Sequence, residues 1–140
     1  MQASDNPARR PAETPGVAAD RRPARAVVAV VATSPETVLE DIQRAMVLGE
    51  IGRYLDPDVA TLLKINISWQ HWYPGCSTTP WQLEGVIKAL RALGHRELIG
   101  AHNGTVVVDS FEGETKNKHK VVQDRCSLPT VHLDTPPNRW

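Results

Sequence analysis

Cysteine is scarce in this chain, and its scarcity excludes two classes of protein. The 140 residues contain only Cys76 and Cys126, too few for a disulfide framework and without the paired spacing of a zinc or iron–sulfur site. The single spacing of His71 and Cys76 is too common to indicate a metal site. We therefore expect no bound metal and a protein of a reducing, cytoplasmic compartment.

Long apolar runs, net charge and phosphate-binding motifs are also lacking. The longest unbroken apolar run, 26–32, has seven residues, whereas a membrane-spanning helix needs roughly 18–20. Lysine plus arginine and aspartate plus glutamate both number 16, so no overall field attracts nucleic acid. Neither GxxxxGK[ST] nor GxGxxG occurs. The sequence predicts no membrane or nucleic-acid partner, and it identifies no cofactor.

The composition divides the chain into a leader and one domain. Residues 1–25 contain four prolines, five arginines and three acidic residues, so they can bury too little apolar surface to offset the entropy of ordering. We expect a disordered leader, followed by an α/β domain over residues 26–140.

The domain is expected to begin with a strand and a helix. The run 26–32 is continuous and rich in valine, a pattern typical of a strand covered on both faces. Ser34 as N-cap and Pro35 in the first turn then predict a helix over 35–48.

A second strand is expected over residues 61–68. Its alternation places Ile65 and Ile67 on one face and Lys64 and Asn66 on the other. A polar face in an apolar strand indicates either a binding site or the solvated face of an edge strand.

The clearest helical spacing in the sequence follows residue 79. Thr79 is expected to cap this helix, Pro80 to be its first residue and Gly94 to end it. The remaining expected elements are a strand at 97–101, a strand or part of a helix at 105–110, a helix at 116–126 and a strand at 130–133.

Alternating strands and helices indicate βαβ units with right-handed crossovers. The expected fold is an α/β domain with three layers and a mostly parallel sheet, equivalent to half of a Rossmann-like or flavodoxin-like fold. Because nothing in the sequence covers the outer sheet edges, we expect an incomplete domain or a partner chain at the edge.

Ligands of open parallel sheets bind beyond the carboxyl ends of the strands. Residues there, and on the polar strand face, are the expected site. We expect His102 and Lys64 to be catalytic. The expected ligand-binding residues are Asn66, Ser68, Trp72, Ser77, Thr78 and Asn103.

Each of these residues also has a structural interpretation. The hydroxyls after the second strand can cap the next helix, and Trp72 can pack on its own loop. His102 can be an ordinary turn histidine. His119 lies between Lys118 and Lys120, which is typical of a solvated helix face.

Three strings, LLKINISWQHWYPGCSTTPWQLEGVI, ELIGAHNGTVVVD and NKH, together resemble the bacterial and archaeal domain-of-unknown-function family 362. The K-x-N pair Lys64 and Asn66 is the most recognisable feature. The resemblance runs from about residue 26 to the end and covers the N-terminal third of the usual family domain. It implies an α/β domain, joined in some members to ferredoxin-like modules. The C-x2-C-x2-C-x3-C run of those modules is absent here.

The leading functional hypothesis is the ligand-binding part of an enzyme that acts on a small anionic substrate. In it Lys64 and Asn66 orient the substrate, and His102 transfers a proton. The alternatives are a non-catalytic ligand-binding or assembly module and a truncated reading frame without independent activity.

Overall fold

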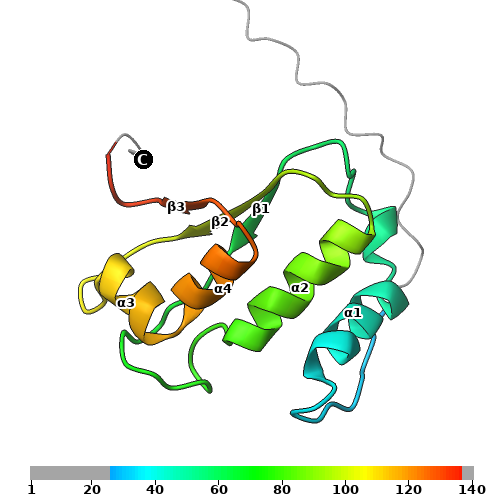
Figure 1. Ribbon diagram of the computed structural model, residues 1–140, viewed down its shortest axis with the longest axis horizontal. Helices are drawn as coiled ribbons and strands as arrows, with labels where there is room; N and C mark the ends of the chain where they lie inside the picture. Colours follow the sequence, from blue (N-terminus) through cyan, green and yellow to red (C-terminus); the bar gives the residue numbers. More distant parts are fainter. Residues whose placement is uncertain (1–25, 137–140) are drawn as a thin grey trace, which may run out of the picture.

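The computed structural model describes residues 26–136 (Figure 1). The leader predicted at 1–25 lies outside the described residues, as do residues 137–140.

Within residues 26–136, three short strands form one parallel sheet. They are β1 (Thr61–Lys64), β2 (Leu98–His102) and β3 (Thr130–His132), in the order β1-β2-β3. Since successive strands run in the same direction, each connection must cross over the sheet, and helices make these crossovers. The α/β fold class with a parallel sheet is confirmed. The strands predicted at 97–101 and 130–133 are found within one residue.

In the described part of the chain four helices accompany the sheet: α1 (Val38–Leu48), α2 (Pro80–Ala92), α3 (Ser110–Lys116) and α4 (His119–Arg125). A short 3-10 helix, Ile51–Arg53, follows α1. The expectation for α2 is confirmed at both ends. The Thr79 hydroxyl accepts a hydrogen bond from the Gln82 amide at 3.3 Å, and Gly94 takes a left-handed φ of 96°.

The core lies on one face of the sheet. Ile65 and Ile67 are buried there, whereas Leu62 on the opposite face of β1 is 56% exposed. The helices contribute Leu83, Ile87, Leu90 and Val122 to the same core. The helices of residues 26–136 lie on this face of the sheet. The described residues therefore contain no second layer of helices on the opposite face.

Helix α1 is attached to the domain through α2 rather than through the sheet. None of its residues is fully buried. The two helices come close at Gly85, where an added Cβ would lie only 2.9 Å from Cβ of Ile42. A glycine on α2 therefore permits the contact.

The prediction of a strand at residues 26–32 is wrong. Residues 26–32 form no strand, and Val28 and Val30 are 80% and 89% exposed. A β-branched run favours a strand only where a neighbouring strand pairs with it, and none does so among the described residues. The following helix begins at Val38 rather than at 35, because residues 35–37 form a turn and Ser34 does not cap it.

The helix predicted at 116–126 is two helices. Lys118 has a left-handed φ of 65°, which ends the run of α3 and starts α4 at His119. The undecided segment 105–110 is neither a strand nor wholly a helix. Thr105 and Val108 form an isolated antiparallel bridge, and Asp109 then caps α3 by accepting from the Glu112 amide at 2.7 Å.

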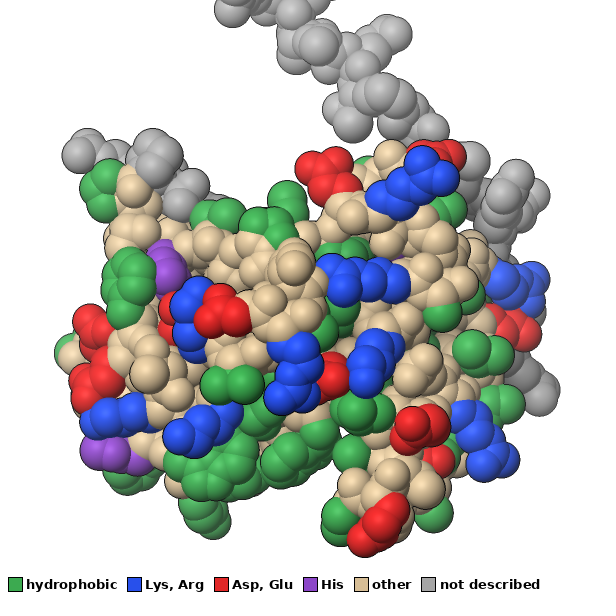
Figure 2. Space-filling view, in the orientation of Figure 1, with side chains coloured by type: hydrophobic (Ala, Val, Ile, Leu, Met, Phe, Trp, Pro, Cys, Tyr) green, Lys and Arg blue, Asp and Glu red, His purple; other side chains and the backbone are tan. Residues whose placement is uncertain are grey.

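On the face seen in Figure 2, basic and acidic side chains are interspersed, and neither sign gathers into one large patch. Among the described residues no helix has the length and apolar character needed to cross a membrane.

Candidate functional site

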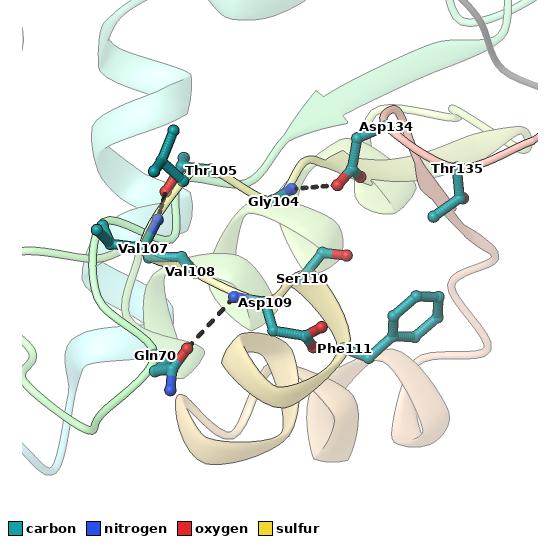
Figure 3. A pocket seen from close by; sticks show the side chains of 11 residues that line it. Gln70, Gly104, Thr105, Val107, Val108, Asp109, Ser110, Phe111, Asp134 and Thr135 are labelled. Atoms are coloured by element: carbon teal, nitrogen blue, oxygen red, sulfur yellow. Dashed lines mark hydrogen bonds between the residues drawn. The ribbon is translucent and has the colours of Figure 1, made fainter.

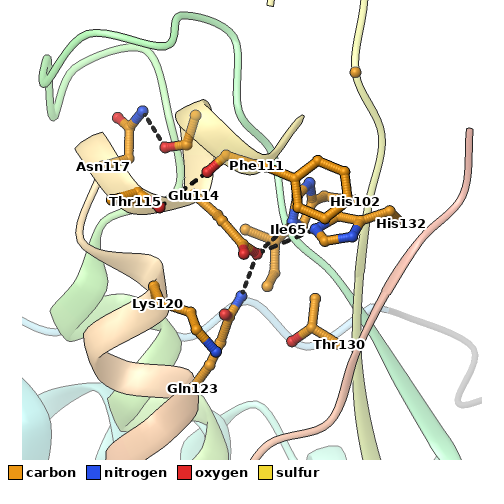
Figure 4. A network of polar contacts seen from close by, with 12 residues as sticks. Ile65, His102, Phe111, Glu114, Thr115, Asn117, Lys120, Gln123, Thr130 and His132 are labelled. Carbon is orange, nitrogen blue, oxygen red and sulfur yellow. Dashed lines mark hydrogen bonds and ion pairs between the residues drawn. The ribbon is translucent and has the colours of Figure 1, made fainter. Parts of the chain in front are cut away.

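A buried polar cluster joins the ends of β2 and β3 to helix α3 (Figure 4). Nε2 of His102 lies 2.9 Å from Oε2 of Glu114, and Nε2 of His132 lies 3.3 Å from the same oxygen. His102 is fully buried and Glu114 is 7% exposed. The sequence interpretation did not include Glu114 or His132.

The sheet register brings the two histidines together. His102 is the last residue of β2 and is paired directly with His132 of β3, so their rings meet edge to face with centroids 4.6 Å apart. Helix α3 delivers Glu114 because its neighbour Gly113 lets the helix approach the core: an added Cβ would lie 2.9 Å from Cγ2 of Ile67.

Two further side chains frame the cluster. The Gln123 amide of α4 donates a hydrogen bond to Oε2 of Glu114 at 3.3 Å. The Phe111 ring packs on the His132 ring with centroids 3.9 Å apart. The carboxylate oxygen therefore faces three nitrogen atoms inside a partly apolar wall.

The charge states follow from this environment. Burial pushes the pKa of Glu114 upward, but hydrogen bonds from His102, Gln123 and His132 outweigh burial and leave the pKa lowered. Burial lowers the pKa of His102 below its ordinary value, against the opposing hydrogen bond to Glu114. Near neutral pH the cluster thus contains a carboxylate and a neutral His102 imidazole.

The cluster has the donor set of a metal site. One ligand atom from each of His102, Glu114 and His132 can be chosen so that all three lie within 4.8 Å of one another. Two imidazole nitrogens and a carboxylate oxygen suit zinc and other divalent transition metals. Among residues 26–136, His71 and Cys76 belong to no such group.

A cavity of about 490 Å³ opens beside the cluster, at the carboxyl edge of the sheet (Figure 3). It lies between segment 104–111, Gln70 and the residues after β3, and Phe111 separates it from His132. Its charged lining residues are Asp109 and Asp134. An anionic substrate, as expected from the sequence, meets no lysine or arginine in this lining.

The structure does not bring the predicted site residues into one pocket. His102 lies on the core face, whereas Lys64 and Asn66 are exposed on the opposite face of their strand. Nζ of Lys64 donates to the carbonyl of Ile65 at 2.9 Å. The alternation predicted for this segment is confirmed, but it separates these residues rather than gathering them.

The polar residues after β1 form hydrogen bonds within the loop that contains them. The Thr78 hydroxyl accepts from the Asn66 amide at 3.0 Å, and the Ser77 hydroxyl accepts from the Ser68 amide at 3.3 Å. The Asn66 side chain donates to the Ser68 hydroxyl at 2.8 Å and to the Cys76 carbonyl at 3.3 Å. These contacts show a structural use for each residue.

The other two predicted ligand residues also have local partners. Trp72 is 43% exposed and meets Trp81 edge to face with centroids 6.2 Å apart. The Asn103 side chain donates to the carbonyl of Gly104 at 2.8 Å. Neither residue lines the cavity beside the cluster.

His119 was expected on a solvated helix face, and this expectation is wrong. It is fully buried, and its Nε2 lies 2.5 Å from the carbonyl of Thr78. The flanking lysines point outward while the first turn of α4 carries His119 inward. A sequence signal for the missed His132 did exist, since it lies in the strand predicted at 130–133, and His102 directly follows the strand predicted at 97–101, parallel to it.

Comparisons of this chain with protein-family models, with curated proteins and with solved structures find no match.

Proposed function

We propose that this domain binds one divalent transition-metal ion, of which zinc is the best fit, through His102, Glu114 and His132. The observation that carries the proposal is the convergence of these three donors, from β2, α3 and β3, within 4.8 Å of one another. Zinc sites that combine two histidines with one carboxylate are typical of metal-dependent hydrolytic enzymes.

The protonation states support metal binding. Metal ligands must be deprotonated, and the lowered pKa values of Glu114 and His102 leave both groups in the required form near neutral pH. Gln123 orients the carboxylate from the side, as outer partners of metal ligands do. Three protein ligands leave at least one position for water or substrate, and a bound ion would act there as a Lewis acid.

Burial favours this proposal over direct proton transfer by His102. A fully buried imidazole has no surface through which to meet a substrate, whereas a metal ion needs only its lone pair. His132 lies nearer the surface, with a side chain that is 14% exposed, and Phe111 covers it on the cavity side. The Phe111 ring therefore stands between the site and the cavity.

The test is a zinc titration of the full chain after treatment with a chelator, followed by competition with a chromophoric chelator. We expect one equivalent to bind. His132→Ala and Glu114→Gln should each weaken binding by more than about 100-fold, since even outer-shell changes cost roughly 10–100-fold. His71→Ala removes an exposed histidine and is the matched control.

Cobalt substitution gives a second readout, because its visible absorption reports the ligands directly. If the His71→Ala and His132→Ala variants bound zinc with equal affinity, the proposed metal site would be refuted. Circular dichroism of each variant separates loss of a ligand from loss of the fold, and Glu114→Gln keeps the size of the side chain.

We further propose that the domain is the N-terminal part of a larger unit like that of family 362, placed in the cytoplasm. The 56% exposure of Leu62 and the unpaired outer edge of β1 in the described sheet support an additional covering element. Both cysteines are free thiols, which fits a reducing compartment. Size determination and limited proteolysis of a longer natural chain test this proposal.

A further inference from the structure

The cavity of about 490 Å³ beside the polar cluster of His102, Glu114 and His132 has features that the proposed metal site does not use. Its volume is within the range of sites for small molecules, roughly 300–1,000 Å³. Val106, Val107 and Val108 lie along one side, where Val106 and Val107 are largely exposed at the rim, and the Phe111 ring forms another part. Phe111 is 52% exposed, so its ring is available to a ligand.

The hydroxyl of Ser110 points into this cavity. Ser110 is 4% exposed, and its side chain makes no hydrogen bond with any described residue. Figure 3 shows its oxygen directed into the space between Asp109, Asp134 and Thr135. A hydroxyl that is not used within the protein can donate to a ligand or accept from one.

Two carboxylates face the same space. One oxygen of Asp109 accepts from the Glu112 amide at 2.7 Å, and one oxygen of Asp134 accepts from the Gly104 amide at 3.0 Å. Within the described part of the chain the second oxygen of each carboxylate has no hydrogen-bond donor. The lining contains no lysine, arginine or histidine to neutralise them.

We propose that this cavity binds a small organic cation that carries a primary ammonium group on a short apolar chain. The carboxylates of Asp109 and Asp134 accept from the ammonium, and the Phe111 ring face adds a cation–π contact. The valine side chains at the rim contact the hydrocarbon chain, and the Ser110 hydroxyl supplies the remaining polar contact. An ammonium on an apolar chain fits better than a bare metal ion because valine and phenylalanine side chains also line the cavity.

The experiment is an NMR titration of the full chain, kept free of metal by a chelator so that its outcome is independent of the zinc site. The probe is n-butylamine at pH 7, and butyrate and Mg²⁺ are titrated in parallel. We expect saturable shifts of the backbone amides of residues 104–111 and 134–135 with the amine alone.

Isosteric variants identify the recognising groups. Asp109→Asn keeps the helix cap, because asparagine caps as well as aspartate, and Asp134→Asn keeps an oxygen for the Gly104 amide. Each should weaken butylamine binding by about tenfold or more. Asp124→Asn removes an exposed carboxylate of α4 and should change nothing.

The proposal is overturned if butylamine causes no saturable shifts, or if butyrate or Mg²⁺ binds the cavity in its place. It is also overturned if Asp124→Asn weakens binding as much as Asp109→Asn and Asp134→Asn do, because binding would then reflect overall charge.

Discussion

Replacing Gly85 by alanine tests how helix α1 is held on the domain. The new Cβ would lie 2.9 Å from both Cβ and Cγ2 of Ile42, closer than carbon atoms pack without movement. Cβ of Ile42 is fixed to the backbone of α1, so a change of rotamer cannot remove the contact. Helix α1 must therefore shift away from α2.

The expected effect is the difference between two opposing terms. Overpacking typically costs about 1–3 kcal/mol. Alanine gains up to about 1 kcal/mol over glycine inside a helix. We expect a net loss of roughly 1 kcal/mol in the free energy of unfolding.

Urea denaturation followed by circular dichroism measures this loss. In a double-mutant cycle, Ile42→Ala removes Cγ2 and Cδ1 but keeps Cβ of the close contact, so Gly85→Ala should still destabilise in that background, but by less than in the original chain. A gain of about 1 kcal/mol for Gly85→Ala alone, with no coupling to Ile42→Ala, would refute the packing described here.

Three other predictions concern the core, a helix cap and pH. Leu83→Ala should lower the free energy of unfolding by about 2–5 kcal/mol, because Leu83 is only 4% exposed, and an unchanged urea midpoint would contradict this. Thr79→Ala should cost about 1 kcal/mol by removing the cap of α2, whereas Thr79→Asp should restore stability; equal losses for both would exclude a capping role. Stability should fall as pH drops from 7.5 toward 5. Burial lowers the pKa of His102 and of His119 below the ordinary 6.5, so near and below that pH the unfolded chain binds more protons than the folded chain. Urea midpoints of the metal-free protein at several pH values check this, and a flat profile would show that these groups do not titrate differently on unfolding.

The elements that could be predicted from the sequence are those specified by neighbouring residues. Thr79 and Pro80 begin α2, and Gly94 ends it, because caps act on amides and carbonyls within one turn. The alternation around Ile65 and Ile67 likewise depends only on the two-residue period of a strand. The parallel order followed from the alternation of strands and helices.

Elements that depend on distant partners were not predictable in this way. The run 26–32 has strand propensity, but no described strand pairs with it. The break at Lys118 is a single left-handed residue inside a helical pattern, and lysine carries no local signal for it. Tertiary packing decides both the conformation of residues 26–32 and the helix break at Lys118.

The candidate site shows the same division. Sequence reasoning selected His102 because it follows a strand, and it predicted the parallel strand that carries His132. It could not pair the two histidines, because their contact depends on the register between β2 and β3. Glu114 reaches them only because Gly113 lets α3 pack closely on Ile67. Local sequence thus located β2 and β3, the start but not the end of β1, the best helix and one member of the site. The register and helix packing decided what that residue contacts.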